Sequence, residues 1–428
     1  MYGENVRLVK WEDVMSLQSV FSVCGMCPAR CPIEVEIENG KCRLIHGNRY
    51  FPGIKGALCT RGAAGIPFLQ DTERPQFPLA RTGERGSGRW RRVSWEQAFA
   101  MAAEKINSVR KTHGGRAILW QDTGGAFSDL RQAFVRGLNS PNFFTGESIE
   151  GVNRQMAALS LFGFTDDRLV LDFVNAKETV LQGRNLFESV NITQANQLMD
   201  GLARGGRLTV IDVRSTVTSG KANRFFMIRP GTDYIFNLSV IHTLISRKWY
   251  HTAYADTWIS GMDRLERSVA TYTPEAAEKE TGIKAEEIVR FTESLAKAAP
   301  AVIWHPGWHT GKYQDSYFVC RTAFIINALL GSIGAIGGIP LANSPEDIGK
   351  NGLKKIADLF SKITEPRAHD SQDGPFACEP GRLHKAFQSI ETASPYAIKG
   401  LVTYQQDPLT DLPDPVRLKS LMEKLDFS

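Results

Sequence analysis

Four cysteines near the start of the chain constrain its fold more than any other feature. Their spacing is C-x2-C-x3-C-x27-C, and they are Cys24, Cys27, Cys31 and Cys59. Three closely spaced thiols can hold one side of a metal centre, and a fourth that returns from a distance can complete the ligand set. Iron–sulfur clusters are held by four such thiolates. The spacing therefore predicts an iron–sulfur cluster.

Two other interpretations of these cysteines stay open. A structural zinc site usually combines C-x2-C with a second close pair or with two histidines, whereas here the second half has one cysteine and His46 stands alone. The other interpretation is that the thiols are unliganded or form disulfides. The remaining cysteines are scattered, which argues against a disulfide framework; they are Cys42, Cys320 and Cys378.

The composition is that of an ordinary globular protein. The chain has 428 residues, of which 42% are hydrophobic and 23% charged, so it can bury more than one core. The net charge is +5 without a long basic run, which gives nucleic-acid binding little support.

No apolar run reaches roughly 18 residues, so no membrane span is predicted. The N-terminus lacks the apolar core of a signal peptide, which at face value predicts a cytoplasmic protein. A longer natural N-terminus, or export together with a partner, would instead place the protein on the periplasmic face of the membrane.

A β-hairpin is predicted between the third and fourth cysteines. Residues 1–20 are interpreted as a polar lead-in, and apolar side chains then alternate with glutamates from Ile33 to Glu38. Asn39-Gly40 is the preferred pair for a tight hairpin turn. Such a hairpin would bring Cys59 back to the other thiols.

The rest of the chain repeats a strand–loop–helix pattern. Short apolar strands are predicted at 117–120, 178–182, 207–212, 225–229, 301–304 and 401–404, and most are followed by a glycine-containing loop and a helix. This order is typical of a doubly wound α/β fold. Ser94 and Gln97 have capping-box spacing and open a helix to about Lys111.

Polar and glycine residues follow the predicted strands. In open α/β sheets ligands bind beyond the carboxyl ends of the strands, where glycine lets backbone approach a phosphate and arginine can bind it bidentately. The candidate cofactor-binding residues are Gly183, Arg184, Asn185, Asp212, Arg214, Thr216, Gly231, Thr232, Asp233, His305, Gly307, Gln406 and Asp407. Each alone is more often a helix cap, but the ordered set indicates a nucleotide-bearing cofactor.

With the cysteine motif in front, this ordering resembles the molybdopterin oxidoreductases of the dimethyl sulfoxide reductase family. The resemblance covers about residues 20–428. The matching motifs are Cys59-Thr-Arg61-Gly62, Val93-Ser-Trp-Glu-Gln-Ala98, Leu138-Asn-Ser-Pro-Asn142, Gly183-Arg-Asn185, Ile211-Asp-Val-Arg214, Arg229-Pro-Gly-Thr-Asp233 and Ile325-Ile-Asn-Ala-Leu-Leu330.

The resemblance implies a fold and a set of cofactors. The fold would be a small iron–sulfur domain at 1–70, a discontinuous and incomplete α/β lobe at 71–150 plus 341–428, and an inserted α/β lobe at 151–340. The two lobes would be related by pseudo-two-fold symmetry, and a C-terminal barrel domain would be missing. The four cysteines would hold a 4Fe-4S cluster, and the strand-end residues would contact a bis-molybdopterin guanine dinucleotide with molybdenum or tungsten. Arg61 matches a basic residue on the electron path between cluster and pterin.

The chain departs from the family pattern in three places. The loop 144–153 has no cysteine where the family places a metal ligand; its nearest match is Glu150, with Glu147 and Ser148 beside it. The last loop has Gln-Asp-Pro where an asparagine before proline is common. The chain also stops where a new strand is about to begin, which indicates a truncated or split protein.

Three functions are compared. The preferred hypothesis is the catalytic subunit, or its N-terminal part, of a molybdenum or tungsten oxidoreductase most similar to the polysulfide, thiosulfate and arsenate reductase branch. Its implied partners are a ferredoxin-like iron–sulfur electron-transfer subunit and a membrane anchor or quinone-reactive subunit. The alternative is a non-catalytic homologue in a respiratory membrane complex that keeps the cluster and lacks the metal. A nicotinamide dehydrogenase is disfavoured because no G-x-G-x-x-G follows a strand.

Overall fold

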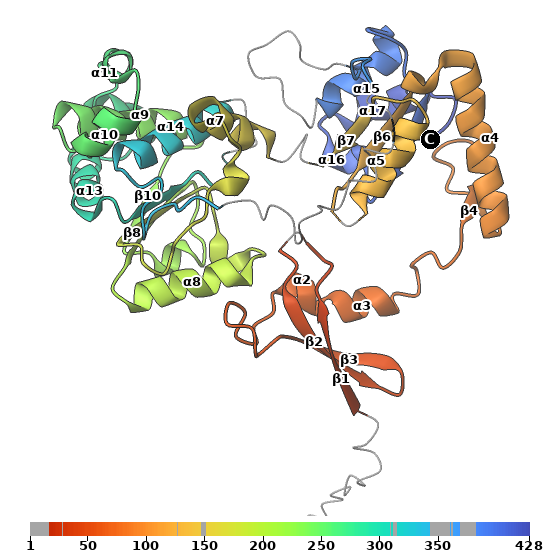
Figure 1. Ribbon diagram of the computed structural model, residues 1–428, viewed down its shortest axis with the longest axis horizontal. Coiled ribbons are helices and arrows are strands. Elements are labelled where there is room, and N and C mark those ends of the chain that lie inside the picture. Colours follow the sequence, from red (N-terminus) through yellow and green to blue (C-terminus); the bar gives the residue numbers. More distant parts are fainter. Residues whose placement is uncertain are drawn as a thin grey trace, which may run out of the picture. The chain divides into compact units, whose positions relative to one another are not determined.

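The computed structural model describes residues 17–27, 29–125, 127–146, 151–308, 310, 315–342, 360, 363–368 and 382–428. Glu147, Ser148 and Glu150 lie outside the described residues. The chain divides into two compact units, which are described separately below. The first unit contains 1–73, 169–310 and 318–342, and the second contains 74–168, 311–317 and 343–428 (Figure 1).

The first unit begins with a three-stranded antiparallel sheet in the order β1-β2-β3. Its strands are β1 Leu17–Val23, β2 Pro32–Glu38 and β3 Lys41–Gly47, and two short helices follow, α2 Thr60–Ala63 and α3 Gly65–Gln70. The predicted hairpin is confirmed, and its turn residues Asn39 and Gly40 have φ angles of 51° and 75°. The interpretation of 1–20 as a polar lead-in is wrong from Leu17 onward, because β1 pairs with β2 along its whole length.

A parallel four-stranded sheet forms the second part of this unit, in the order β10-β9-β8-β11. Its strands are β8 Glu178–Gln182, β9 Arg207–Asp212, β10 Arg224–Met227 and β11 Val302–His305. The helices are α8 Ile192–Ala203, α9 Asp233–Ser246, α10 Thr252–Trp258, α11 Met262–Val269, α12 Pro274–Thr281, α13 Ala285–Ala298 and α14 Ser316–Leu329, with short 3-10 turns at Leu186–Glu188 and Ser219–Lys221. The predicted strands and helix starts lie within two residues of these bounds.

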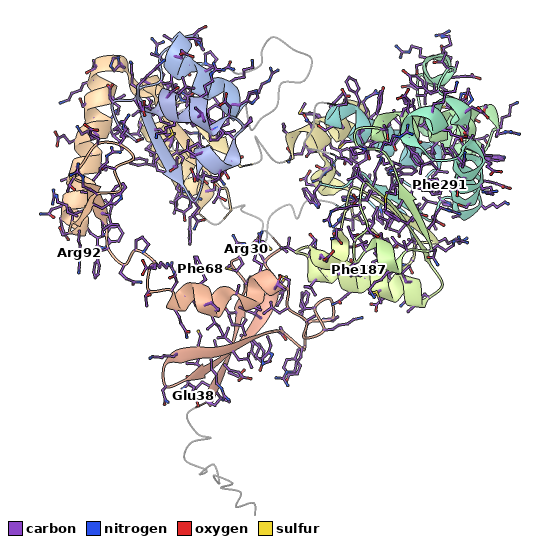
Figure 2. All side chains as sticks on the ribbon, turned by 180° about the vertical axis from the view of Figure 1, so that it is seen from behind. Arg30, Glu38, Phe68, Arg92, Phe187 and Phe291 are labelled. Carbon is purple, nitrogen blue, oxygen red and sulfur yellow. The ribbon has the colours of Figure 1, made fainter. Side chains whose placement is uncertain are left out.

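The main core of this unit lies between the parallel sheet and the helices on one of its faces. Phe226, Phe236, Phe291 and Trp304 form a chain of ring contacts with centroids 5.2–6.4 Å apart. Figure 2 labels Phe291, which comes from α13. Such aromatic pairs add to the stabilisation that burial alone gives.

The second unit contains another parallel sheet, in the order β12-β6-β7, and a two-stranded antiparallel ribbon. Its strands are β4 Leu79–Arg81, β5 Trp90–Arg92, β6 Ile118–Asp122, β7 Phe143–Thr145 and β12 Gly400–Tyr404. The helices are α4 Trp95–His113, α5 Ser128–Gly137, α7 Val152–Phe162, α15 Leu383–Thr392, α16 Pro408–Asp411 and α17 Pro415–Met422, with 3-10 turns at Gly115–Ala117 and Asp166–Arg168. Phe427 forms a parallel bridge with Gly400, as the predicted start of a further strand requires.

A local sequence signal determines where the first helix of this unit begins. Ser94 accepts a hydrogen bond from the Gln97 amide while Gln97 Oε1 accepts from the Ser94 amide, so the predicted capping box opens α4. The core consists of apolar side chains from β6, β7, β12, α15 and α17, among them Leu119, Phe144 and Phe387. The predicted α/β fold class is therefore confirmed, while the three-domain division stays a prediction. No helix of the described residues has the length and apolar character needed to cross a bilayer.

Candidate functional site

The four predicted cluster ligands lie together at one end of the antiparallel sheet. Cys24 and Cys27 follow β1, Cys31 precedes β2 and Cys59 is the N-cap residue of α2. The Cys24 amide donates to the Cys31 carbonyl at 2.8 Å, which closes the loop between the first three cysteines. Burial raises the pKa of the Cys31 thiol, and the charges of Cys27, Cys24 and Cys59 raise it further. The Cys31 thiol therefore lies close enough to the other three for their charges to act on it.

This donor set fits an iron–sulfur cluster. Four thiolates that repel each other need compensating positive charge, and a cluster's iron ions supply it. Within the described residues, no group of three or more His, Cys, Asp or Glu side chains could hold a single metal ion. A 4Fe-4S cluster has a different ligand geometry from a single ion, because its four thiolates surround four irons and do not meet at one metal. Arg61 lies on α2, exposed and two residues after Cys59, and its role in electron transfer stays a prediction.

The residues after β8 form a tightly bonded turn at the carboxyl edge of the parallel sheet. Gly183 has a φ of 60° and is buried. Arg184 is also buried and donates through Nη2 to Gln194 Oε1. Asn185 accepts from Thr218 Oγ1 at 2.7 Å and donates to Glu188.

The residues after the neighbouring strand β9 lie at the same edge. Asp212 accepts from the Val213 amide at 2.7 Å, and Arg214 is exposed. Thr216 and Ser219 exchange hydrogen bonds, which fixes the loop. The hydrogen bond from Asn185 lowers the pKa of Glu188, as do the Val217 amide and, more weakly, the charge of Arg214. The half-buried carboxylate of Asp212 and the exposed Glu188 carboxylate and Arg214 guanidinium lie at one edge, where they can bind sugar hydroxyls and phosphate.

The third group of predicted residues is Gly231, Thr232 and Asp233, and not all of their side chains point outward. Gly231 has a φ of 80°, and no atom lies within 4 Å of the position where a side chain would begin. Thr232 donates its hydroxyl to the Arg229 carbonyl at 2.6 Å. Asp233 is 5% exposed and accepts from Gln182 Nε2 at 3.0 Å, so it belongs to a buried polar network.

Gln182 is the centre of that network, and the sequence did not single it out. Its Oε1 accepts from Trp304 Nε1 at 2.9 Å and from Asn237 Nδ2 at 3.2 Å. His305 is buried and accepts from the Gly307 amide at 2.8 Å. A side chain at Gly307 would begin 2.0 Å from the Gln182 carbonyl oxygen, so this loop packs directly on the end of β8. The available signal was a glutamine at the end of the predicted strand 178–182, directly before the glycine of the following loop.

In the second unit, the carboxyl ends of β6 and β12 hold a separate polar group. Asp407 caps α16 by accepting from the Leu409 amide at 3.0 Å. Gln406 Oε1 accepts from Gln121 Nε2 at 3.4 Å. Gln121 is fully buried, and its own Oε1 has no hydrogen-bond partner among the described residues. A buried acceptor of this kind is what a bound hydrogen-bond donor would satisfy, which fits a polar heterocycle at this edge.

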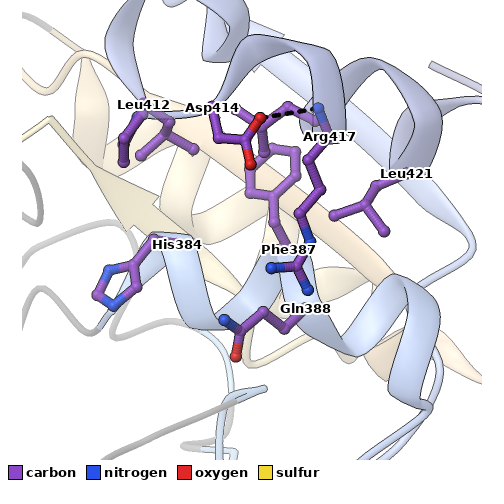
Figure 3. Close-up of a pocket in the computed structure, with 9 residues that line it drawn as sticks. His384, Phe387, Gln388, Leu412, Asp414, Arg417 and Leu421 are labelled. Atoms are coloured by element: carbon purple, nitrogen blue, oxygen red, sulfur yellow. Dashed lines mark hydrogen bonds between the residues drawn. The ribbon is translucent and has the colours of Figure 1, made fainter.

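A surface hollow in the second unit contains none of the predicted residues. It lies between α15 and α17 and has an apolar floor that includes Phe387 and Leu421, with His384, Gln388 and Arg417 around it (Figure 3).

Comparisons with known proteins identify the family. A model described as the molybdopterin oxidoreductase Fe4S4 domain matches residues 17–71, and one described as molybdopterin oxidoreductase matches residues 74–427. The chain belongs to the molybdopterin oxidoreductase family.

Relatives within this molybdopterin oxidoreductase family agree with the assignment. The thiosulfate reductase molybdopterin-containing subunit PhsA of Salmonella typhimurium is 30% identical over 416 residues, which cover 95% of this chain and 54% of PhsA. Acetylene hydratase of Syntrophotalea acetylenica is 27% identical over 337 residues, 76% of this chain and 44% of that protein. The chain therefore spans about half the length of these relatives.

A solved structure matches the fold. Acetylene hydratase from Pelobacter acetylenicus superposes with a TM-score of 0.80 at 21% identity, covering 95% of this chain and 59% of that one. This structure confirms the α/β fold class, while the family models and PhsA confirm the resemblance inferred from the sequence and the Fe4S4 domain. The individual ligand and contact residues stay predictions.

Proposed function

We propose that this chain carries the cluster-binding and part of the cofactor-binding portion of a molybdenum or tungsten oxidoreductase that uses a bis-molybdopterin guanine dinucleotide. The observation that supports it most strongly is structural: Cys24, Cys27 and Cys31 lie between β1 and β2, Cys59 opens α2, and the four lie together at one end of the antiparallel sheet. The polar residues at the ends of β8 and β9, and those at the ends of β6 and β12, supply hydrogen-bonding partners suited to nucleotides. When bound, a molybdopterin cofactor supplies two-electron redox chemistry at its metal.

In this proposal, the residues of this chain bind and orient the cofactor. Asn185, Asp212 and Arg214 would hold one guanine dinucleotide at the edge of the β8–β9 sheet, while Gln121, Gln406 and Asp407 would contact a polar ring at the edge of β6 and β12. Gly231 is exposed and no atom lies within 4 Å of the position where its side chain would begin, so its backbone would be open to a phosphate. Asp233 and His305 would act indirectly, because Asp233 accepts from Gln182 and His305 accepts from the Gly307 amide, all inside the first unit.

For the substrate we favour a sulfur–sulfur compound such as thiosulfate, because the match to PhsA covers almost the whole chain. The electron acceptor or donor would be a ferredoxin-like iron–sulfur subunit, with a membrane anchor or quinone-reactive subunit beyond it. Arg61 would lie on the electron path, and the cellular location stays a prediction.

Metal analysis of the protein purified without oxygen tests the proposal. We expect about four irons and one molybdenum or tungsten per chain, and loss of most of the iron in Cys24→Ser. Cys42→Ser is the matched control, since Cys42 lies in β3 outside the motif and this variant should keep its iron. A full iron complement in Cys24→Ser would contradict the cluster assignment.

A second function is favoured by one observation, the absence of cysteine from the loop 144–153. It is the non-catalytic homologue that keeps the cluster and lacks the metal. The same measurement separates the two, because this homologue would contain iron without molybdenum, tungsten or pterin. Glu150→Gln gives a second comparison: loss of molybdenum or tungsten with unchanged iron would identify Glu150 as a metal ligand.

A further inference from the structure

One helix of the first unit contacts both the cluster-binding segment and the carboxyl edge of the parallel sheet. This helix is α8, and its Asn196 lies against the turn that precedes Cys59. Asn196 Nδ2 donates to the carbonyl oxygens of Gly53 at 3.0 Å and Ile54 at 3.1 Å. One turn later, Asp200 accepts from Lys55 Nζ at 2.7 and 2.8 Å. The turn is thus bonded to α8 at three consecutive residues.

The turn itself is tight and well packed. The amides of Ile54 and Lys55 both donate to the Phe51 carbonyl, at 3.1 and 3.0 Å. Ile54 is fully buried, and a side chain at Gly53 would begin 3.0 Å from the methyl carbon of Thr193 on α8. Because both hydrogens of the Asn196 amide are used, the side chain holds the turn in one orientation.

The first turn of the same helix reaches the sheet. Gln194 Oε1 accepts from Arg184 Nη2, and Arg184 directly follows Gly183 at the end of β8. Asn191 caps the helix by accepting from the Gln194 amide at 3.2 Å. Residues two apart in a helix point to different sides, so Gln194 and Asn196 bind two different partners from one rigid element.

We propose that α8 fixes the distance between the cluster and the cofactor-binding edge of the sheet, with Asn196 and Gln194 as positioning residues. The inference rests on the proposed function, because it requires a cluster at the cysteines. Electron transfer between two centres slows steeply as their separation grows or fluctuates. A helix bonded at both sites keeps that separation constant.

The test compares Asn196→Ala with Met199→Ala, which changes a 43% exposed side chain on the same helix. In Asn196→Ala we expect hydrogen exchange at the amides of residues 54–57 to rise about tenfold, the size expected for losing neutral hydrogen bonds. Iron content should stay unchanged, while the electron paramagnetic resonance spectrum of the reduced cluster broadens. Asn196→Gln, which keeps the amide, should recover part of the protection.

Two controls make the outcome decisive. Lys55→Met removes only the exposed ion pair to Asp200 and should change exchange little, because such pairs contribute little. Equal exchange and identical spectra in Asn196→Ala and Met199→Ala would overturn the positioning role. Absence of iron from the unmodified protein would instead contradict the proposed function, and the exchange result would still report on the turn.

Discussion

Asp122 is a residue whose environment the sequence alone did not reveal. It ends β6 with its side chain fully buried, and it pairs with Arg131 of α5 through Nε at 2.6 Å and Nη2 at 3.0 Å. Its carboxylate also accepts from the Gly124 amide at 2.7 Å and from Trp120 Nε1 at 3.1 Å. The pair raises the pKa of Arg131, whose guanidinium lies 3.8 Å from the ring centre of Tyr404.

Replacing Arg131 with methionine should strongly destabilise the second unit. The substitution keeps an unbranched apolar stem but removes the counter-ion of a buried carboxylate, which costs about 3–5 kcal/mol. Hydrogen exchange at the amides of β6 would measure the free energy of opening.

Arg267→Met is the matched control for this substitution. Its ion pair with Asp263 is on the surface, with both side chains 72% exposed, and should contribute less than about 1 kcal/mol. Similar opening energies in the two variants would show that the buried pair does not hold β6 to α5.

Gly201 shows at the level of a secondary-structure element how packing overrides propensity. Alanine inside a helix is usually better than glycine by about 0.5–1 kcal/mol. A side chain at this position of α8 would begin 2.0 Å from the Phe173 carbonyl oxygen, a backbone atom that cannot move aside freely. The glycine therefore allows α8 to lie directly on the segment before β8.

Gly201→Ala should lower the stability of the first unit by about 1–3 kcal/mol, opposite to the intrinsic preference of the helix. Thermal unfolding followed by circular dichroism would detect a lower midpoint. Gly220→Ala provides the comparison, because no atom lies within 4 Å of that position and its midpoint should stay unchanged. A raised midpoint in Gly201→Ala would mean that α8 moves away from Phe173 at little cost.

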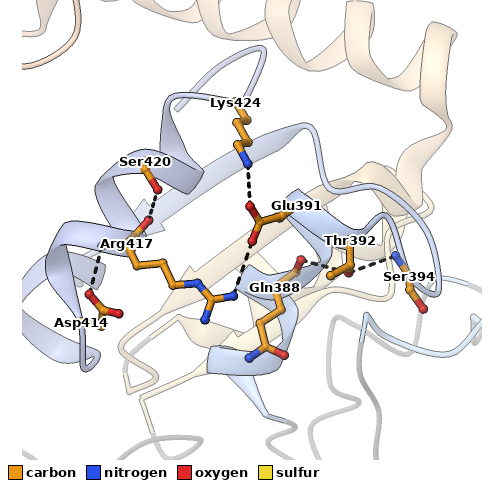
Figure 4. A network of polar contacts seen from close by, with 8 residues as sticks. All are labelled: Gln388, Glu391, Thr392, Ser394, Asp414, Arg417, Ser420 and Lys424. Carbon is orange, nitrogen blue, oxygen red and sulfur yellow. Dashed lines mark hydrogen bonds and ion pairs between the residues drawn. The ribbon is translucent and has the colours of Figure 1, made fainter.

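A charged network links α15 to the end of the second unit (Figure 4). Glu391 accepts from Lys424 Nζ at 2.8 Å and from Arg417 Nη2 at 3.5 Å. The hydrogen bond and charge of Lys424, followed by those of Arg417, lower the pKa of Glu391. A carboxyl group whose folded-state pKa is lowered stabilises the fold above its unfolded pKa of about 4.3, and this contribution is lost as the pH falls through the folded value.

Glu391→Gln should therefore unfold at a lower temperature than the unmodified protein at pH 7, with the difference disappearing on acidification below about pH 4. Unfolding temperatures at a series of pH values would measure this. A difference that is the same at every pH would show that the amide substitution acts through packing and not through charge.

For the whole molecule, the sequence predicted where the helices and strands lie better than it predicted what surrounds the side chains at their ends. The Asn39-Gly40 turn, the Ser94 cap and the buried strands follow from neighbouring residues, and the structure has each of them. Strand β1 was missed because all seven of its residues are exposed, so no burial pattern distinguishes it from a loop.

The direction of each strand-end side chain depends on residues far away in the chain. Asp212 ends β9 and Asp233 opens α9 after β10, yet Asp233 turns inward to Gln182, 51 positions earlier, while Asp212 accepts from the adjacent amide of Val213. Local sequence cannot distinguish these two outcomes. The family resemblance predicts a set of positions, and the packing shows which of their side chains already bond within the protein.

The pairing of β6 has a consequence for how the protein is made. Gly400 of β12 lies 282 positions after Ile118 of β6, and the two strands are direct neighbours. At typical translation rates, β6 leaves the ribosome roughly 15–60 s before its partner strand exists. During that interval its apolar face and unpaired edge are open to other chains, a known route to aggregation. Yield in a heterologous host should therefore depend on ribosome-associated chaperones more than on the final stability of the fold.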